Sequence, residues 1–112
     1  MKLEKKKQID TFYTQQLAYI LEKMATIKEP TGTLLDNSMI VYGAGISDGD
    51  RHNHDDMPIL IAGRGGGTIK TGRHMQFSAN TPMNNLFVSM LDRMGVPIES
   101  LGDSNGKLSE LF

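Results

Sequence analysis

The chain has 112 residues, enough for a single domain with a modest core. Lysine and arginine total 12 and aspartate and glutamate total 13, so the near-neutral charge argues against a strongly electrostatic nucleic-acid binder. The absence of cysteine excludes disulfides, cysteine-ligated zinc and thiol catalysis. No apolar run reaches the roughly 18 residues that a membrane span requires, and no signal peptide is visible after the basic N-terminus.

Residues 8–27 are predicted to form an amphipathic helix, because apolar residues recur there at helical spacings. The apolar positions are Ile9, Phe12, Tyr13, Leu17, Ile20, Leu21, Met24 and Ile27. We expect this stripe to face the core. Pro30 and Gly32 then end the helix, since proline disfavours helix in the residue before it and glycine permits a turn.

Two short apolar runs, at residues 38–42 and 57–62, are predicted to be buried strands. Their nearly continuous apolar character suits strands that are covered on both faces, as in parallel sheets. After a glycine-rich turn at 63–67, residues 68–77 are expected to supply short strands or a hairpin.

A second helix is predicted to begin at Thr81-Pro82, with a capping hydroxyl and then proline at the first helical position. Its apolar stripe runs to Met94, and Gly95 ends it. The chain therefore predicts an α/β fold in which two amphipathic helices cover a small, mostly parallel sheet. Such a sheet leaves open edges, through which a second copy would pair into a homo-oligomer.

The segment 48–56, DGDRHNHDD, lies between the two predicted strands, where α/β proteins usually place chemistry. It holds four carboxylates and two of the three histidines. These groups are ligands for zinc, manganese or calcium, and a divalent cation would relieve the repulsion among the carboxylates. Asp48, Asp50, His52 and His54 are therefore candidate metal ligands, and Ser47 is a candidate nucleophile.

A solvated turn explains the same segment, because aspartate, asparagine and glycine are ordinary turn residues and Ser47 would then cap the turn. A second candidate site surrounds the glycines at 65–67, whose amides would form a nest for a small anion. Arg64, Lys70 and Arg73 would supply its positive charge, and a plain flexible loop is the alternative.

Three long strings of this sequence resemble one bacterial family of unknown function, which is named for a His-x-x-Ser-His-His motif. The strings are GTLLDNSMIVYG at 32–43, SDGDRHNHDDMPILIAGRGGG at 47–67 and LDRMGVPIESLGDS at 91–104. Members of that family are typically several hundred residues long and commonly exported or periplasmic. The name-giving motif lies near their N-terminus and does not occur in this chain. The resemblance therefore implies that residues 1–112 are a C-terminal fragment of a longer protein.

The family is in turn distantly similar to alkaline-phosphatase and sulfatase-like hydrolases, which bind divalent metals at strand ends. That similarity implies Asp48 as a strand-end ligand and His52 or His54 as a further one, although Ser47-Asp-Gly-Asp50 departs from the usual Asp-His-Gly string. The resulting expectation is a metal-site-bearing part of a phosphate or sulfate ester hydrolase, inactive alone. The alternative is a non-enzymatic structural or binding module.

Overall fold

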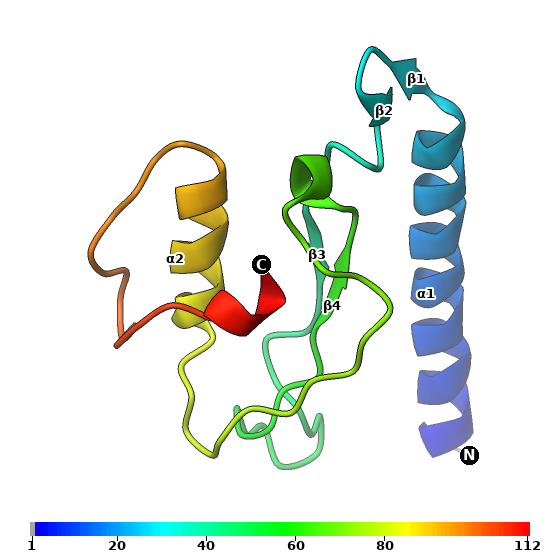
Figure 1. Ribbon diagram of the computed structural model, residues 1–112. Coiled ribbons are helices and arrows are strands. Elements are labelled where there is room, and N and C mark those ends of the chain that lie inside the picture. Colours follow the sequence, from blue (N-terminus) through cyan, green and yellow to red (C-terminus); the bar gives the residue numbers. More distant parts are fainter. Residues whose placement is uncertain (1) are drawn as a thin grey trace.

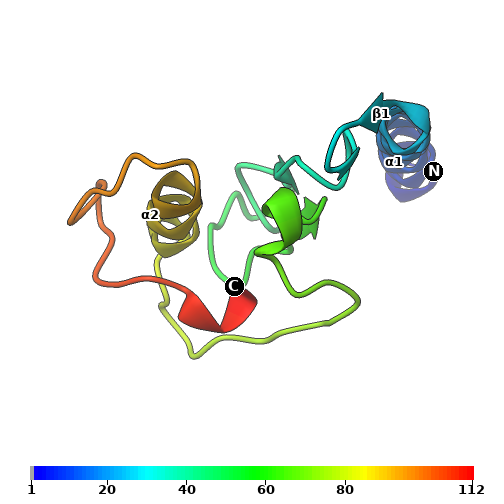
Figure 2. The same ribbon diagram turned by 45° about the horizontal axis from the view of Figure 1, so that its top comes forward.

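The computed structural model describes residues 2–112. In chain order the elements are α1 (Lys2–Thr26), β1 (Lys28–Glu29), β2 (Gly32–Thr33), β3 (Ile40–Tyr42), β4 (Leu60–Ala62), η1 (Gly65–Gly67), α2 (Asn84–Arg93) and η2 (Ser109–Leu111). The β3–β4 hairpin lies between the two long helices, with α1 on one side and α2 on the other (Figure 1; Figure 2). The arrangement is flat and open, with extents of 49 × 36 × 21 Å.

The predicted parallel sheet is wrong: the described residues form two small antiparallel pairs, β1–β2 and β3–β4, in an α+β arrangement. In the second pair Ile40 faces Ala62 and Tyr42 faces Leu60. The physical reason is the segment that connects β3 to β4. Parallel neighbours need a crossover, usually a helix, whereas the polar segment between β3 and β4 folds as a loop that returns the chain beside itself.

The first predicted helix is confirmed as α1, although it begins at Lys2, earlier than expected. Lysine, glutamate, glutamine and leucine favour helix, and neither glycine nor proline interrupts the chain before Pro30. The expected burial of its apolar stripe is not found, because no residue of α1 is buried. Only Leu17, Leu21 and Met24 reach intermediate burial.

A tight hairpin joins α1 to the rest of the chain at β1 and β2, where the sequence indicated only a turn. The backbone N–H of Thr33 donates to the Asp36 carboxylate at 3.0 Å, and the N–H of Asp36 donates back to the Thr33 hydroxyl at 3.1 Å. The hydrogen bond from the Thr33 N–H is the largest cause of a lowered pKa for the Asp36 carboxyl, and the Thr33 side chain adds a smaller effect in the same direction. The pair fixes the turn that leads to β3.

Glycine is required at position 63, directly after β4. Gly63 has a φ of +96°, and a Cβ there would lie 2.1 Å from the carbonyl oxygen of Ser38. The close approach lets the N–H of Gly65 donate to that same carbonyl at 3.0 Å. The chain therefore folds back on the start of β3 only because no side chain intervenes.

The second predicted helix is confirmed as α2, and it carries half of the buried apolar residues. Val88 and Leu86 are buried there, together with Ile69 and Leu108 from other segments. The predicted cap is wrong: the Thr81 hydroxyl donates to the Ser78 carbonyl, and the helix begins after Met83 without a side-chain cap. Gly95 ends the helix as predicted, with a φ of +77°.

No strand forms between residues 68 and 77 of the described chain, so the expected hairpin there is also wrong. This segment instead runs as an extended connection from η1 to α2. The chain as a whole is looser than a compact domain. Its radius of gyration is 15.8 Å, compared with about 13 Å for a folded chain of this length.

Candidate functional site

Ser47 and Asn53 close the loop that holds most of the candidate site residues. The N–H of Ser47 donates to the carbonyl of Asn53 at 2.9 Å, and the Ser47 hydroxyl donates to the Asn53 side-chain oxygen at 2.6 Å. The N–H of Asp48 reaches the same side-chain oxygen at 3.2 Å. A nucleophilic serine needs a base at its hydroxyl. Here the Ser47 hydroxyl donates to the side-chain amide oxygen of Asn53, which is not a base. These hydrogen bonds close the loop at its two ends.

The Asp48 carboxylate is occupied by the turn that follows it. Its Oδ1 accepts the backbone N–H of Asp50 at 2.9 Å and that of Arg51 at 3.4 Å. Its Oδ2 lies 3.8 Å from Nε of Arg51 in an exposed ion pair. This is the local bonding by which aspartate stabilises turns.

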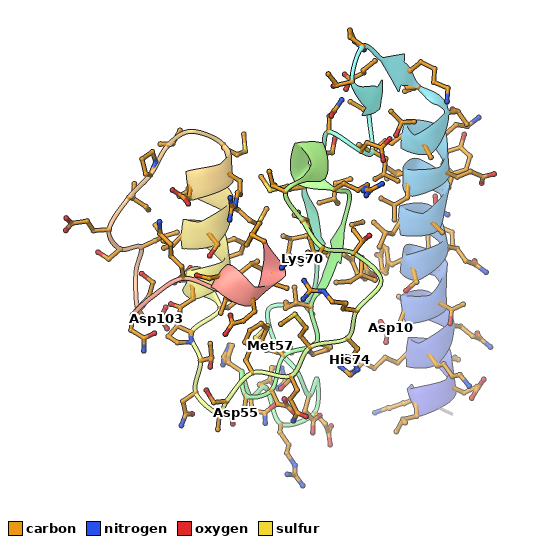
Figure 3. All side chains as sticks on the ribbon, in the orientation of Figure 1. Asp10, Asp55, Met57, Lys70, His74 and Asp103 are labelled. Carbon is orange, nitrogen blue, oxygen red and sulfur yellow. The ribbon has the colours of Figure 1, made fainter. Side chains whose placement is uncertain are left out.

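The two histidines of the loop are exposed, as are Asp50, Asp55 and Asp56. Figure 3 shows Asp55 at the end of the molecule distant from the β1–β2 hairpin. Among residues 2–112, no three histidine, aspartate or glutamate side chains gather closely enough to hold a metal ion. The structure thus brings Asp48 into the turn and leaves the other candidate ligands exposed and apart, so the metal site stays a prediction beside the solvated turn.

One feature of the loop departs from an ordinary turn. His52 and Asp56 have φ values of 55° and 51°, in the left-handed region that non-glycine residues rarely adopt. The N–H of His52 donates to the Asp48 carbonyl at 2.7 Å, which helps to hold this backbone. Such outliers concentrate at functional loops and at tight turns alike.

The backbone amides of the predicted anion site already donate hydrogen bonds within the chain. The amides of Gly65, Gly66 and Gly67 donate to the carbonyls of Ser38, Asp36 and Arg64 respectively. The side chain of Arg64 lies close enough to Asp36 to lower the pKa of that carboxyl, after the larger effect of Thr33. The amides of Gly65 and Gly66 therefore hold η1 onto the turn before β3, and the amide of Gly67 closes the turn of η1 itself.

Arg73 forms hydrogen bonds with the C-terminal segment of the chain. Its guanidinium donates to the carbonyls of Lys70, Glu110 and Leu111 at 3.0 to 3.3 Å. The N–H of Lys70 donates to Leu111 as well, and Figure 3 shows Lys70 beside the C-terminal turn. The structure thus brings Lys70 and Arg73 together at the C-terminal turn. The guanidinium of Arg73 and the N–H of Lys70 there bind backbone carbonyl groups.

Sequence reasoning missed a polar clamp inside the core. Asn85 and Ser89, both buried, are four residues apart on α2. Asn85 exchanges two hydrogen bonds of 2.9 Å with Asn105, and the Ser89 hydroxyl accepts the N–H of Leu108 at 2.8 Å. Two small polar residues on the apolar face of a predicted helix were the available signal.

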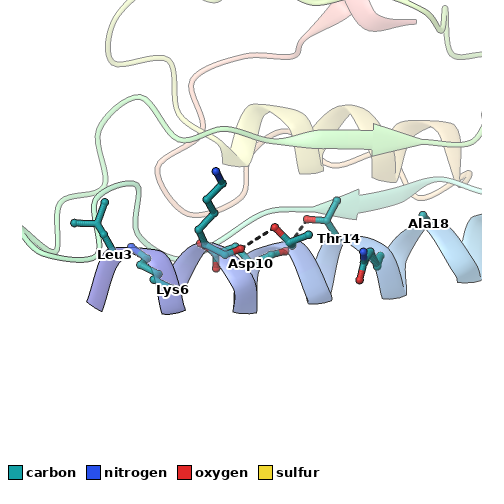
Figure 4. A pocket seen from close by; sticks show the side chains of 8 residues that line it. Leu3, Lys6, Asp10, Thr14 and Ala18 are labelled. Carbon is teal, nitrogen blue, oxygen red and sulfur yellow. Dashed lines mark hydrogen bonds between the residues drawn. The ribbon is translucent and has the colours of Figure 1, made fainter. Parts of the chain in front are cut away.

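Sequence reasoning also missed the open side of α1. A cavity of about 670 Å³ runs along the helix, lined by Leu3, Lys6, Lys7, Asp10, Thr11, Thr14, Gln15 and Ala18. In Figure 4 Thr14 and Ala18 point from α1 toward the side on which the strands are drawn. Lys6 reaches across to the loop, where a Cβ added to Gly49 would lie 2.5 Å from its Nζ.

No helix within residues 2–112 combines the length and apolar character that crossing a membrane demands. No protein-family model, curated protein or solved structure matches this chain.

Proposed function

We propose that this chain is a binding module that becomes complete against another polypeptide surface and catalyses no reaction alone. The observation that carries the proposal is the large solvent-accessible surface of the chain. The chain exposes 8429 Å², whereas a folded monomer of 12.4 kDa exposes about 6,100 Å². The excess is roughly 2,300 Å², more than one partner contributes to a standard protein–protein interface.

Six of the twelve exposed large apolar side chains lie on α1, and this concentration supports docking more than random looseness. Phe12 and Ile20 lie on α1, and Met94 and Val96 lie at the end of α2. Large contiguous apolar surfaces on a folded chain mark interaction sites. The contacts of α1 with the rest of the chain are concentrated at its C-terminal end. There the amides of Leu34 and Leu35 donate to carbonyls of the last helical turn and of Ile27.

The test is to remove the apolar surface without touching the core. In a chain diluted until it sediments as a monomer, Phe12→Gln/Ile20→Gln should reduce the binding of an apolar fluorescent dye. It should leave the denaturation midpoint unchanged, because both side chains are more than half exposed. Thr14→Gln, on the cavity side of α1, is the matched control. A lower midpoint for the double variant alone would show that these side chains belong to the core and would refute the proposal.

The second candidate function comes from the loop and from the resemblance to hydrolases. In it, residues 47–56 form part of an ester-hydrolase site whose other ligands belong to the remainder of a longer protein of the His-x-x-Ser-His-His family. The resemblance of residues 47–67 to that family supports this interpretation, and the left-handed backbone of His52 and Asp56 is compatible with it. In this candidate the loop supplies only part of the ligand set, in keeping with the absence of three gathered ligands among residues 2–112.

Thermal unfolding distinguishes this second candidate from an ordinary turn. A metal that binds only the native state raises the melting temperature as its concentration exceeds the dissociation constant. The metal-stripped chain should be measured with zinc, manganese, calcium or EDTA, beside His52→Ala/His54→Ala. A rise that is lost in the double variant would support the site. No rise with any of these ions would leave the loop as a turn of the binding module.

A further inference from the structure

The hairpin of β3 and β4 lies between the two long helices and is only partly covered (Figure 1). Its six residues are tyrosine or aliphatic, yet none of them is buried, and Leu60 is 47% exposed. Among the helices and strands, each of these two makes its main contacts with the other, and neither long helix packs closely on them. A two-stranded hairpin is marginally stable in water unless a third strand or a helix covers it. The hairpin is therefore an incomplete sheet.

The backbone of the hairpin also has open edges. Among residues 2–112, no backbone hydrogen bond joins β3 or β4 to a segment other than its partner strand. In an antiparallel pair, successive residues turn their N–H and C=O groups alternately toward the partner strand and away from it. Each strand therefore presents unpaired backbone donors and acceptors on its outer side, where water or another extended chain has to bind them.

The edge of β3 lacks the features that normally prevent pairing. Edge strands of soluble proteins usually carry a charge, a proline or a bulge. β4 has two of these nearby, because Pro58 has no backbone donor and Arg64 brings a charge. Residues 37–47, which include β3, contain neither proline nor a charged side chain, and the register of the strand pair is regular. β3 is therefore the edge at which a further strand can pair.

We infer that the outer edge of β3 accepts an extended, uncharged and mainly apolar strand from another polypeptide segment. The inference rests on the proposed function, since it names the kind of partner that completes the module. Strand addition of this kind draws its affinity from backbone hydrogen bonds, which the open edge offers. A helix does not match this edge, because its own backbone groups are already paired internally.

The side chains of β3 determine the composition of the added strand. Ile40, Val41 and Tyr42 are of intermediate burial and point to both sides of the sheet. Cross-strand pairs of β-branched and aromatic side chains stabilise a sheet, so apolar residues in the added strand would pack on these three. A charged residue at the same place would lose water without gaining a partner, because residues 37–47 carry no charge.

A synthetic strand peptide tests the inference directly. The probe places the sequence of residues 59–62, Ile-Leu-Ile-Ala, between pairs of lysines that keep it soluble. This sequence includes β4, which already pairs with β3 on its other side. The matched control is the same peptide N-methylated at its strand amides, which keeps the side chains and removes the backbone donors. We expect the probe to slow hydrogen exchange in residues 39–44 and to leave α1 unchanged. N-methylation should weaken binding at least about tenfold.

Three results would overturn the inference. Equal affinity of the two peptides would show that the contact does not use backbone donors. Protection confined to α1, or no protection at peptide concentrations up to about 1 mM, would show that β3 does not accept a strand. A chain that dimerises without peptide and thereby protects residues 39–44 would show that a second copy occupies this edge.

The failure of this inference is distinguishable from failure of the proposed function. A chain that does not bind the peptide but still binds the apolar dye through Phe12 and Ile20 would remove the added strand and leave the binding module intact. A chain that binds neither the peptide nor the dye would overturn both.

Discussion

The Ser89 hydroxyl accepts a hydrogen bond from the backbone N–H of Leu108 at 2.8 Å and so ties the C-terminal segment to α2. The same hydroxyl donates to the Asn85 carbonyl at 3.1 Å. Ser89 and Leu108 are both buried, so neither group has water as a substitute partner. Together with the hydrogen bonds from Arg73 to the carbonyls of Glu110 and Leu111, this contact holds the C-terminal segment in place.

Ser89→Ala should therefore destabilise the chain by about 1–3 kcal/mol, the usual cost of leaving a buried donor without an acceptor. Urea denaturation followed by circular dichroism measures the change. Ser100→Ala, at an exposed position, is the control and should unfold with the natural chain. Equal midpoints for the two variants would show that the N–H of Leu108 finds another acceptor.

Gly63→Ala should cost more than Gly66→Ala, although both residues have positive φ. At Gly66 nothing lies within 4 Å of an added Cβ, so the change should cost about 1–2 kcal/mol of left-handed strain. At Gly63 the same Cβ would collide with the Ser38 carbonyl, so strain and collision add. Denaturation midpoints decide the order, and equal losses would contradict the close approach of the two backbones.

Stability should fall in acid through Asp36. The hydrogen bonds from Thr33 lower the pKa of Asp36 in the folded chain, so the folded state favours the carboxylate. Its contribution is complete above the unfolded pKa of about 4 and is lost as the pH falls through the lower folded value. Asp36→Asn should flatten the acid limb of a stability–pH curve. Asp55→Asn controls for net charge, and an identical acid limb for Asp36→Asn and the natural chain would contradict the assignment.

The loop at 47–53 should depend on Asn53 more than on its histidines. Asn53→Ala removes the acceptor of the Ser47 hydroxyl and of the Asp48 N–H, so the loop should open locally at a cost of about 1 kcal/mol. Hydrogen exchange of residues 47–53 should then accelerate. His54→Ala should leave this exchange unchanged, because that side chain is exposed. Equal acceleration by both variants would show that His54 has a structural role.

Local patterns in the sequence located both helices and the strands β3 and β4, but they missed the β1–β2 hairpin, placed strands at 68–77 that do not form, and did not show how the elements pack. Helical spacing of apolar residues found α1 and α2, and Gly95 marked the end of α2. The short apolar runs found β3 and β4, but their direction depends on how residues 43–59 fold. The segment is long enough for a crossover, so length alone could not exclude a parallel sheet. Its turn-forming residues were the stronger signal.

The candidate site shows a similar limit. Composition correctly singled out residues 47–56 as a polar loop, but a residue list does not say which oxygen atoms are already used. Asp48 is bonded to the turn, and Ser47 is bonded to Asn53. The apolar spacing of α1 likewise predicted a face that needs cover. It could not say whether the cover comes from this chain or from another.

Hydrogen exchange of α1 tests the central claim most directly. An isolated helix frays unless another surface packs on it. In a dilute, monomeric chain the amides of α1 should exchange much faster than those around Val88 in α2, and they should become protected when another polypeptide surface covers the exposed apolar side chains of α1. Slow exchange of α1 in the dilute monomer, equal to that of α2, would contradict the account, because the helix would then be complete without a partner.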